Sequence, residues 1–187
     1  NPLRKGLADM LISDLSNLKM LRVVERDKLE EVLKEINLSS SAEFDASTQQ
    51  KIGKLLGAET LLFGSYFELL GTFRIDARIV KTQTGEIFKS EGVNGKTEDF
   101  VQLEKELVWK IVSGLDVKFS EKEKSSIMSS KSISYKSTLL YAEGLEYYDN
   151  GNIKSALAKF QESLSLSPEF DKAKSMIAKI SSMQSSK

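Results

Sequence analysis

The stretch LEYYDNGNIKSALAKFQESLSLSP, residues 145–168, contains two short helical patterns on either side of an Asn-Gly turn. Gly151 supplies the turn, and Pro168 cannot continue the second helix. Ala156 is small enough to let the two helices approach closely, and Phe160 fills the space between them. The stretch therefore predicts a helical hairpin with a small core of its own.

Small and aromatic residues recur through this hairpin at fixed offsets. They are Gly144, Tyr147, Gly151, Ala156, Phe160 and Pro168. The pattern resembles one tetratricopeptide repeat, a helix–turn–helix unit that serves protein–protein contact. Glu143 and Ser163 depart from it, because the family usually has a large apolar residue and an alanine at those places. A helical hairpin of another family is the alternative interpretation.

The resemblance implies a concave side lined by the first helix of the hairpin. Its groove-facing positions are Thr138, Tyr141, Leu145, Tyr148 and Asp149. Aromatic side chains on such a surface suit peptide docking, so these five residues are the candidate protein-binding residues. The alternative is that they pack against the rest of the chain, because a lone helical hairpin must cover its apolar face.

The composition limits the classes of function. The 187 residues include 27 Lys and Arg against 27 Asp and Glu, and a balanced charge argues against a nucleic-acid or anionic-membrane partner. The absence of His and Cys removes the commonest general base, the commonest metal ligand and all thiol chemistry. We therefore expect no enzyme activity, no metal and no cofactor. No apolar run reaches the roughly 18 residues of a membrane-spanning helix.

The first part of the chain predicts alternating helices and strands. Leu and Met residues recur at helical spacing over 3–18, and a short apolar strand is expected at Leu21–Glu25. Asp27 and Glu30 form a capping-box-like pair that would open the next helix. Gly57 would end the third helix.

Three strands and a long helix are expected next. Thr60–Leu70 is nearly all apolar, as in a strand covered on both faces. Phe73–Val80 alternates between apolar and charged residues, and Glu86–Val93 follows a tight turn that ends at Gly85. The helix spans about 99–118 and carries a continuous apolar face.

These elements predict a mixed α/β sandwich with a mixed sheet, followed by a small all-α helical-repeat module. The α/β domain covers residues 1–118 and a Ser/Lys-rich connector, helical at its start, covers 119–137. The single repeat, with a C-terminal capping helix, covers 138–183.

Four segments of the first domain together resemble the CsgG-like family, named for a curli assembly and transport component. They are GLADML (6–11), RVVERDKLEEVLKE (22–35), KIGKLLGAETLLFGS (51–65) and RIVKTQTGEI (78–87). The resemblance implies a non-enzymatic bacterial envelope protein, periplasmic or attached to the outer membrane. Lys81 stands where the family often has Asp, and the tight turns leave no room for pore-building hairpins, so pore formation is not carried over.

In the family a further strand precedes the GLADML helix and lies beside the strand expected at Leu21–Glu25. This chain starts almost at that helix, so we expect one strand to be missing and an open sheet edge at Leu21–Glu25 or its neighbour. Such an edge would permit a homo-oligomer. We also expect a periplasmic location, where an upstream lipidated segment not present here would attach the protein to the outer membrane.

Two segments look like ligand sites. Gly95–Thr97 follows a strand as a P-loop does, but Ser90 stands where that motif needs its first glycine. A helix cap made by Thr97 or by Asp99 with Gln102 is favoured instead.

Glu25 and Arg26 lie at a strand end, where ligand crevices of α/β sheets form. A structural ion pair at the start of the following helix is favoured over a ligand site there. The sequence thus predicts a protein-interaction or assembly role in the envelope. The alternative is a periplasmic small-molecule binding or sensor domain that uses the crevice near Glu25.

Overall fold

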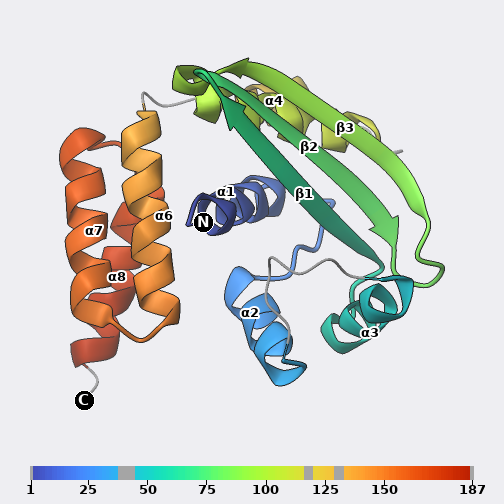
Figure 1. Ribbon diagram of the computed structural model, residues 1–187, viewed down its shortest axis with the longest axis horizontal. Coiled ribbons are helices and arrows are strands. Elements are labelled where there is room, and N and C mark those ends of the chain that lie inside the picture. Colours follow the sequence, from blue (N-terminus) through green and yellow to red (C-terminus); the bar gives the residue numbers. More distant parts are fainter. Residues whose placement is uncertain (1, 38–44, 116–119, 129–132, 186–187) are drawn as a thin grey trace.

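The computed structural model describes residues 2–37, 45–115, 120–128 and 133–185 (Figure 1). In chain order the elements are α1 (Leu3–Ser16), α2 (Arg26–Glu35), α3 (Ala46–Leu56), β1 (Thr60–Leu69), β2 (Thr72–Lys81), β3 (Ile87–Lys96), the 3-10 turn η1 (Thr97–Asp99), α4 (Phe100–Ser113), α5 (Glu121–Met128), α6 (Tyr135–Asp149), α7 (Ile153–Leu166) and α8 (Asp171–Ser185). The mixed α/β class is confirmed.

The three strands form an antiparallel sheet in the order β1-β2-β3. Helix α4 packs on β2 and β3, and α1 packs against α4 on the same side (Figure 1). The alternation predicted for β2 is confirmed, because Phe73, Ile75 and Ala77 are buried while Arg74 is exposed. One face of the sheet therefore carries the core, as is common for antiparallel sheets.

The prediction that β1 is covered on both faces is wrong. Phe67 is 61% exposed and Leu69 is 56% exposed, and both lie on the face of the sheet opposite the core. The continuous apolar run suggested a central strand, but β1 is an edge strand in the described sheet. The sheet there is also antiparallel throughout rather than mixed.

The strand predicted at Leu21–Glu25 is also not found. This stretch runs between α1 and α2 without a ladder partner in the described part of the chain. Glu25 is the N-cap of α2, so Asp27 lies inside the helix and makes no capping box with Glu30. The Asp27 carboxylate instead binds Lys179 and Arg26. A short apolar run becomes a strand only where a neighbour supplies backbone partners.

The expected connector includes helix α5, whose Ile127 is buried against the α/β core. Residues 116–119 and 129–132 lie outside the described residues, and so do the last residues of the helix predicted over 99–118. Helix α6 starts at Tyr135, earlier than predicted, because the Ser134 hydroxyl caps it by accepting from the Ser137 amide.

Helices α6, α7 and α8, together called the helical module, enclose a second core. The predicted hairpin is present, with Gly151 at φ 75° in the turn and Phe160 fully buried between the helices. A Cβ at Gly144 would lie 2.5 Å from the Phe160 ring, so only glycine permits this approach.

Candidate protein-interaction surface

The helical module is seated on the α/β part through α1, which lies between α6 and the sheet (Figure 1). A Cβ added to Gly6 would lie 2.7 Å from the Ala142 Cβ, so the two helices cross at small residues. This close approach brings the polar side of α1 against the face of α6 on which the groove residues were predicted.

Tyr141 of α6 is buried and its hydroxyl donates to Asp9 Oδ2 at 2.7 Å. Burial, followed by the charge of Asp9, raises the pKa of Tyr141 well above its ordinary value. The Lys172 ammonium of α8 donates to the same carboxylate oxygen at 2.9 Å. Helices α1, α6 and α8 therefore meet at one carboxylate.

A second carboxylate, Asp149 at the end of α6, receives both a guanidinium and an ammonium. Nη1 of Arg26 lies 2.9 Å from each Asp149 oxygen, and Lys5 Nζ lies 2.7 Å from Oδ2. Nε of Arg26 lies 3.5 Å from Asp9 Oδ1. Burial alone would lower the pKa of Arg26, but the charge and hydrogen bond of Asp149, together with the charges of Asp9 and Asp27, hold the pKa above its usual value.

We call this set of side chains the Arg26 cluster: Lys5, Asp9, Arg26, Asp27, Tyr141, Asp149, Lys172 and Lys179. Asp27 binds Lys179 of α8, and although burial opposes the change, this hydrogen bond and charge lower the pKa of Asp27. Arg26 is only 5% exposed, so the cluster is a structural joint between the two parts of the chain. Arg26 is thus a structural ion-pair residue, but its partners are Asp9, Asp27 and Asp149, and no pair between Glu25 and Arg26 is found among the described residues.

The five predicted groove residues are mostly covered. Thr138, Tyr141 and Leu145 are buried, and the side chain of Asp149 is held by Arg26 and Lys5. Tyr148 is half-exposed; its hydroxyl contacts the Met183 sulfur, and Lys179 lies over its ring at 5.2 Å. The contacts are those of the packing alternative, because Tyr141 and Leu145 lie in the core of the helical module, Tyr148 contacts α8, and α1 binds Asp149 and the Tyr141 hydroxyl.

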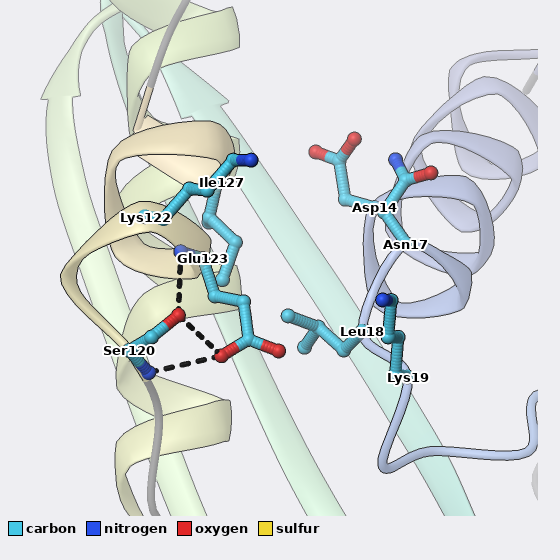
Figure 2. Close-up of a pocket in the computed structure, with 8 residues that line it drawn as sticks. All are labelled: Asp14, Asn17, Leu18, Lys19, Ser120, Lys122, Glu123 and Ile127. Carbon is cyan, nitrogen blue, oxygen red and sulfur yellow. Dashed lines mark hydrogen bonds between the residues drawn. The ribbon is translucent and has the colours of Figure 1, made fainter.

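Two cavities lie away from Glu25. The first, about 320 Å³, separates the end of α1 from α5 and is lined by charged and polar side chains including Asp14, Lys19 and Lys122 (Figure 2). There Glu123 accepts hydrogen bonds from the Ser120 amide and hydroxyl (Figure 2). The second, about 690 Å³, lies between α3 and the β2–β3 turn. In neither do polar groups converge on one point in a way that defines a ligand.

The described residues contain neither a candidate metal site nor a membrane-spanning helix. No group of three His, Cys, Asp or Glu side chains in these ranges could hold a metal ion. Within the same residues no helix is long and apolar enough to cross a membrane.

Gly95–Thr97 ends β3 and enters η1. The predicted helix cap is wrong, because neither Thr97 nor Asp99 caps through its side chain. Thr97 instead donates its hydroxyl to Glu68 Oε1 at 3.2 Å and its amide to the Gly71 carbonyl at 2.9 Å. This segment therefore anchors the β1–β2 turn.

The β1–β2 turn carries the most exposed apolar side chains of the sheet. We call Phe67, Leu69 and Leu70 the hairpin-tip patch. Leu70 is 95% exposed and adopts φ 50°, followed by Gly71 at φ 76°. Two residues with positive φ make a type I′ turn, for which Asn-Gly is the preferred sequence. Sequence reasoning missed this patch, although Leu-Gly in a two-residue turn was the available signal.

A buried carboxyl lies between α1 and α4. Glu104 is fully buried and its oxygens have no hydrogen-bond partner among the described residues, while Lys105 Nζ lies 3.5 Å from Oε2. Burial, followed by the charge of Asp14, raises the pKa of Glu104 to about 8. The fold therefore favours the protonated acid at this position.

Comparison with known proteins supports the resemblance of the first part. A family model described as "Curli production assembly/transport component CsgG" matches residues 2–69. No match is found among curated proteins. A solved structure, the LpoB C-terminal domain from Salmonella enterica, is 22% identical with a TM-score of 0.38. The alignment covers 44% of this chain and 62% of that one, less than two thirds of its length. The tetratricopeptide resemblance stays a prediction.

Proposed function

We propose that this chain is a non-catalytic protein of the bacterial cell envelope that works by binding another protein through the hairpin-tip patch. The CsgG-like match over residues 2–69 is compatible with an envelope role and supports a periplasmic location. The absence of His and Cys supports a role without catalysis. The α6 side predicted as a groove is not proposed as the contact, because α1 covers it.

The observation that best supports the proposal is the strained and exposed conformation of Leu70. A bulky side chain in the left-handed region costs roughly 1 kcal/mol relative to glycine, and an exposed leucine recovers nothing from burial. Nothing in the described fold offsets this cost, since the side chain is 95% exposed. Burial of Leu70 against a partner would offset it. Phe67 and Leu69 continue the same exposed apolar surface, which is typical of the centre of a protein interface.

The patch is held in place by the rest of the fold. Glu68 accepts hydrogen bonds from Thr97 and from the Tyr135 hydroxyl, the latter at 2.9 Å. Burial, and then this hydrogen bond to Glu68, raise the pKa of Tyr135. The turn is therefore tied to β3, through η1, and to the start of α6, and a preorganised surface loses little entropy when a partner binds.

We further propose that the helical module is a tetratricopeptide-type repeat used within the chain. One repeat cannot bury a continuous core alone. Here α1 takes the place of a neighbouring repeat and the Arg26 cluster locks the contact. The module then serves to brace the hairpin tip through Tyr135.

Site-specific photo-cross-linking in the cells of origin tests the proposal. A photoreactive phenylalanine analogue replaces Phe67 in one variant and Leu166 in a control. Leu166 is 45% exposed and lies in α7 of the helical module, outside the patch. We expect position 67 to cross-link a protein other than a second copy of this chain, and position 166 to cross-link none. Equal or absent cross-linking at both positions would contradict the proposed contact.

A further inference from the structure

The free edge of β1 is defined by the geometry of the β1–β2 turn. In a two-residue hairpin the flanking pair, here Leu69 and Thr72, exchanges both backbone hydrogen bonds. Odd-numbered residues of β1 therefore direct their backbone groups towards β2. The residue just before β1 shows the same direction. The carbonyl of odd-numbered Glu59 accepts a hydrogen bond from the amide of Thr82, which follows β2, at 3.0 Å. Even-numbered residues, among them Gly64 and Tyr66, direct theirs to the free edge.

The side chains on the outer face of β1 form a palindrome, with the same order of residue types in both directions along the strand. Its odd-numbered residues are Leu61, Phe63, Ser65, Phe67 and Leu69, so the row is Leu-Phe-Ser-Phe-Leu. The row contains no charge. Two identical strands that pair antiparallel about a two-fold axis at Ser65 place residues at equal distances from Ser65 opposite one another, and in this row each such pair consists of two identical uncharged residues.

From the unpaired edge of β1 in the described sheet and from this uncharged row we infer that two copies of the chain pair through their β1 edges, antiparallel, about a two-fold axis at Ser65. Phe63 then faces Phe67 of the other copy, and Leu61 faces Leu69 of the other copy. On the inner face Tyr66 covers Gly64 of the other copy, an arrangement that fills the space left by glycine. The two three-stranded sheets become one continuous sheet.

The pairing satisfies backbone groups as well as side chains. With Ser65 on the axis, its two copies form a non-hydrogen-bonded pair, and the pairs on either side are hydrogen-bonded. Gly64 with Tyr66 and Leu62 with Glu68, each counted twice by symmetry, give about eight inter-chain backbone hydrogen bonds. These groups belong to the even-numbered residues, which no strand pairs within the described chain.

The exposed area sets the strength of the dimer. Phe67 and Leu69 together leave roughly 200 Å² of side-chain surface accessible on each copy. A stable interface buries about 800 Å² per partner, so this contact is a weak one. We therefore expect a weak dimer whose population rises with protein concentration.

A single cysteine at the axis provides a geometric test, because the chain has no cysteine of its own. Facing Cα atoms of a non-hydrogen-bonded pair lie about 4.5 Å apart, within the range for a disulfide. Ser65→Cys should form an inter-chain disulfide at least about tenfold faster than Ser90→Cys under mild oxidation. Ser90 is an equally exposed control on the same face, on the opposite edge strand. Equal rates would overturn the inference.

Charge at the axis gives a second test by light scattering between about 1 and 200 µM. The wild type should rise from the monomer mass of 20.9 kDa towards twice that value. Ser65→Lys and Ser65→Asp should each stay monomeric and their equimolar mixture should recover the dimer, while Ser90→Lys should dimerise as the wild type does. A monomeric wild type, or a dimer that survives both Ser65 changes, contradicts the pairing.

The contact of the hairpin-tip patch with another protein and the pairing of two copies through β1 can be tested independently. Leu70 lies outside the palindromic row, so Leu70→Asn should leave the dimer intact while it removes the cross-linked partner. Ser65→Lys should have the reverse effect. Loss of both properties in one variant with an intact circular-dichroism spectrum would show that the partner is the second copy, and the heterologous partner would then be refuted.

Discussion

Replacing Arg26 with methionine should loosen the helical module from the α/β part. The guanidinium is 5% exposed and bonds both oxygens of Asp149 at 2.9 Å. Methionine keeps much of the side-chain volume but leaves Asp149 with Lys5 alone. Breaking a buried pair from one side typically costs about 3–5 kcal/mol, because the remaining charge stays desolvated. We expect a loss of that size in the free energy of unfolding.

Urea denaturation followed by circular dichroism measures the loss, and Arg74→Met is the matched control. Arg74 likewise bonds both oxygens of a carboxylate, that of Asp76, but its side chain is 58% exposed. Exposed pairs contribute at most about 1 kcal/mol. If Arg26→Met and Arg74→Met differ by less than about 0.5 kcal/mol, the Arg26 cluster is not the joint that holds the module.

Three further changes have defined outcomes. Glu104 has a pKa of about 8 in the folded protein against an ordinary 4.5, so between these pH values the folded state holds a proton that the unfolded state releases. The stability that this proton gives to the folded state is present below pH 4.5 and is lost as the pH rises to 8. In urea melts, the free energy of unfolding of the wild type should fall by about 2–4 kcal/mol between pH 5 and pH 8, and Glu104→Gln should remove that fall. A fall of the same size in the variant would contradict the prediction. Phe160→Ala should cost about 3–5 kcal/mol and Tyr148→Ala clearly less; equal losses would show that Phe160 does not hold the hairpin. Gly6→Val, which would collide with Ala142, should speed hydrogen exchange in α6, and unchanged protection would argue against the close crossing.

Local patterns in the sequence predicted local structure well. The alternation of Phe73 to Ile79 placed one face of β2 in the core, and Gly57, at φ 61°, ended α3 as its sequence position indicated. The hairpin with Gly151 and Phe160 was equally readable. Each of these features depends on residues a few positions apart, where steric and periodic rules apply.

Features that depend on distant partners could not be predicted. Arg26 and Asp149 are separated by 123 positions, and nothing near either residue indicates the other. The apolar run at Leu21–Glu25 looked like a strand because the sequence does not show whether a neighbour supplies backbone partners. The same limit applies to the groove on α6: its residues were readable as one face of a helix, but not the fact that α1 covers them.

We propose that the hairpin-tip patch binds a protein partner and that its exposed leucine lowers the stability of the free chain. The deciding measurement is the yield of the cross-linked partner from a Leu70→Asn variant that carries the photoreactive residue at position 67. Asparagine suits the type I′ turn, so the variant should be about 0.5–1 kcal/mol more stable than the wild type. The account predicts that this more stable protein loses the cross-linked partner while Leu166→Asn keeps it. A stabilised Leu70→Asn variant that retains the partner at wild-type yield would contradict the account.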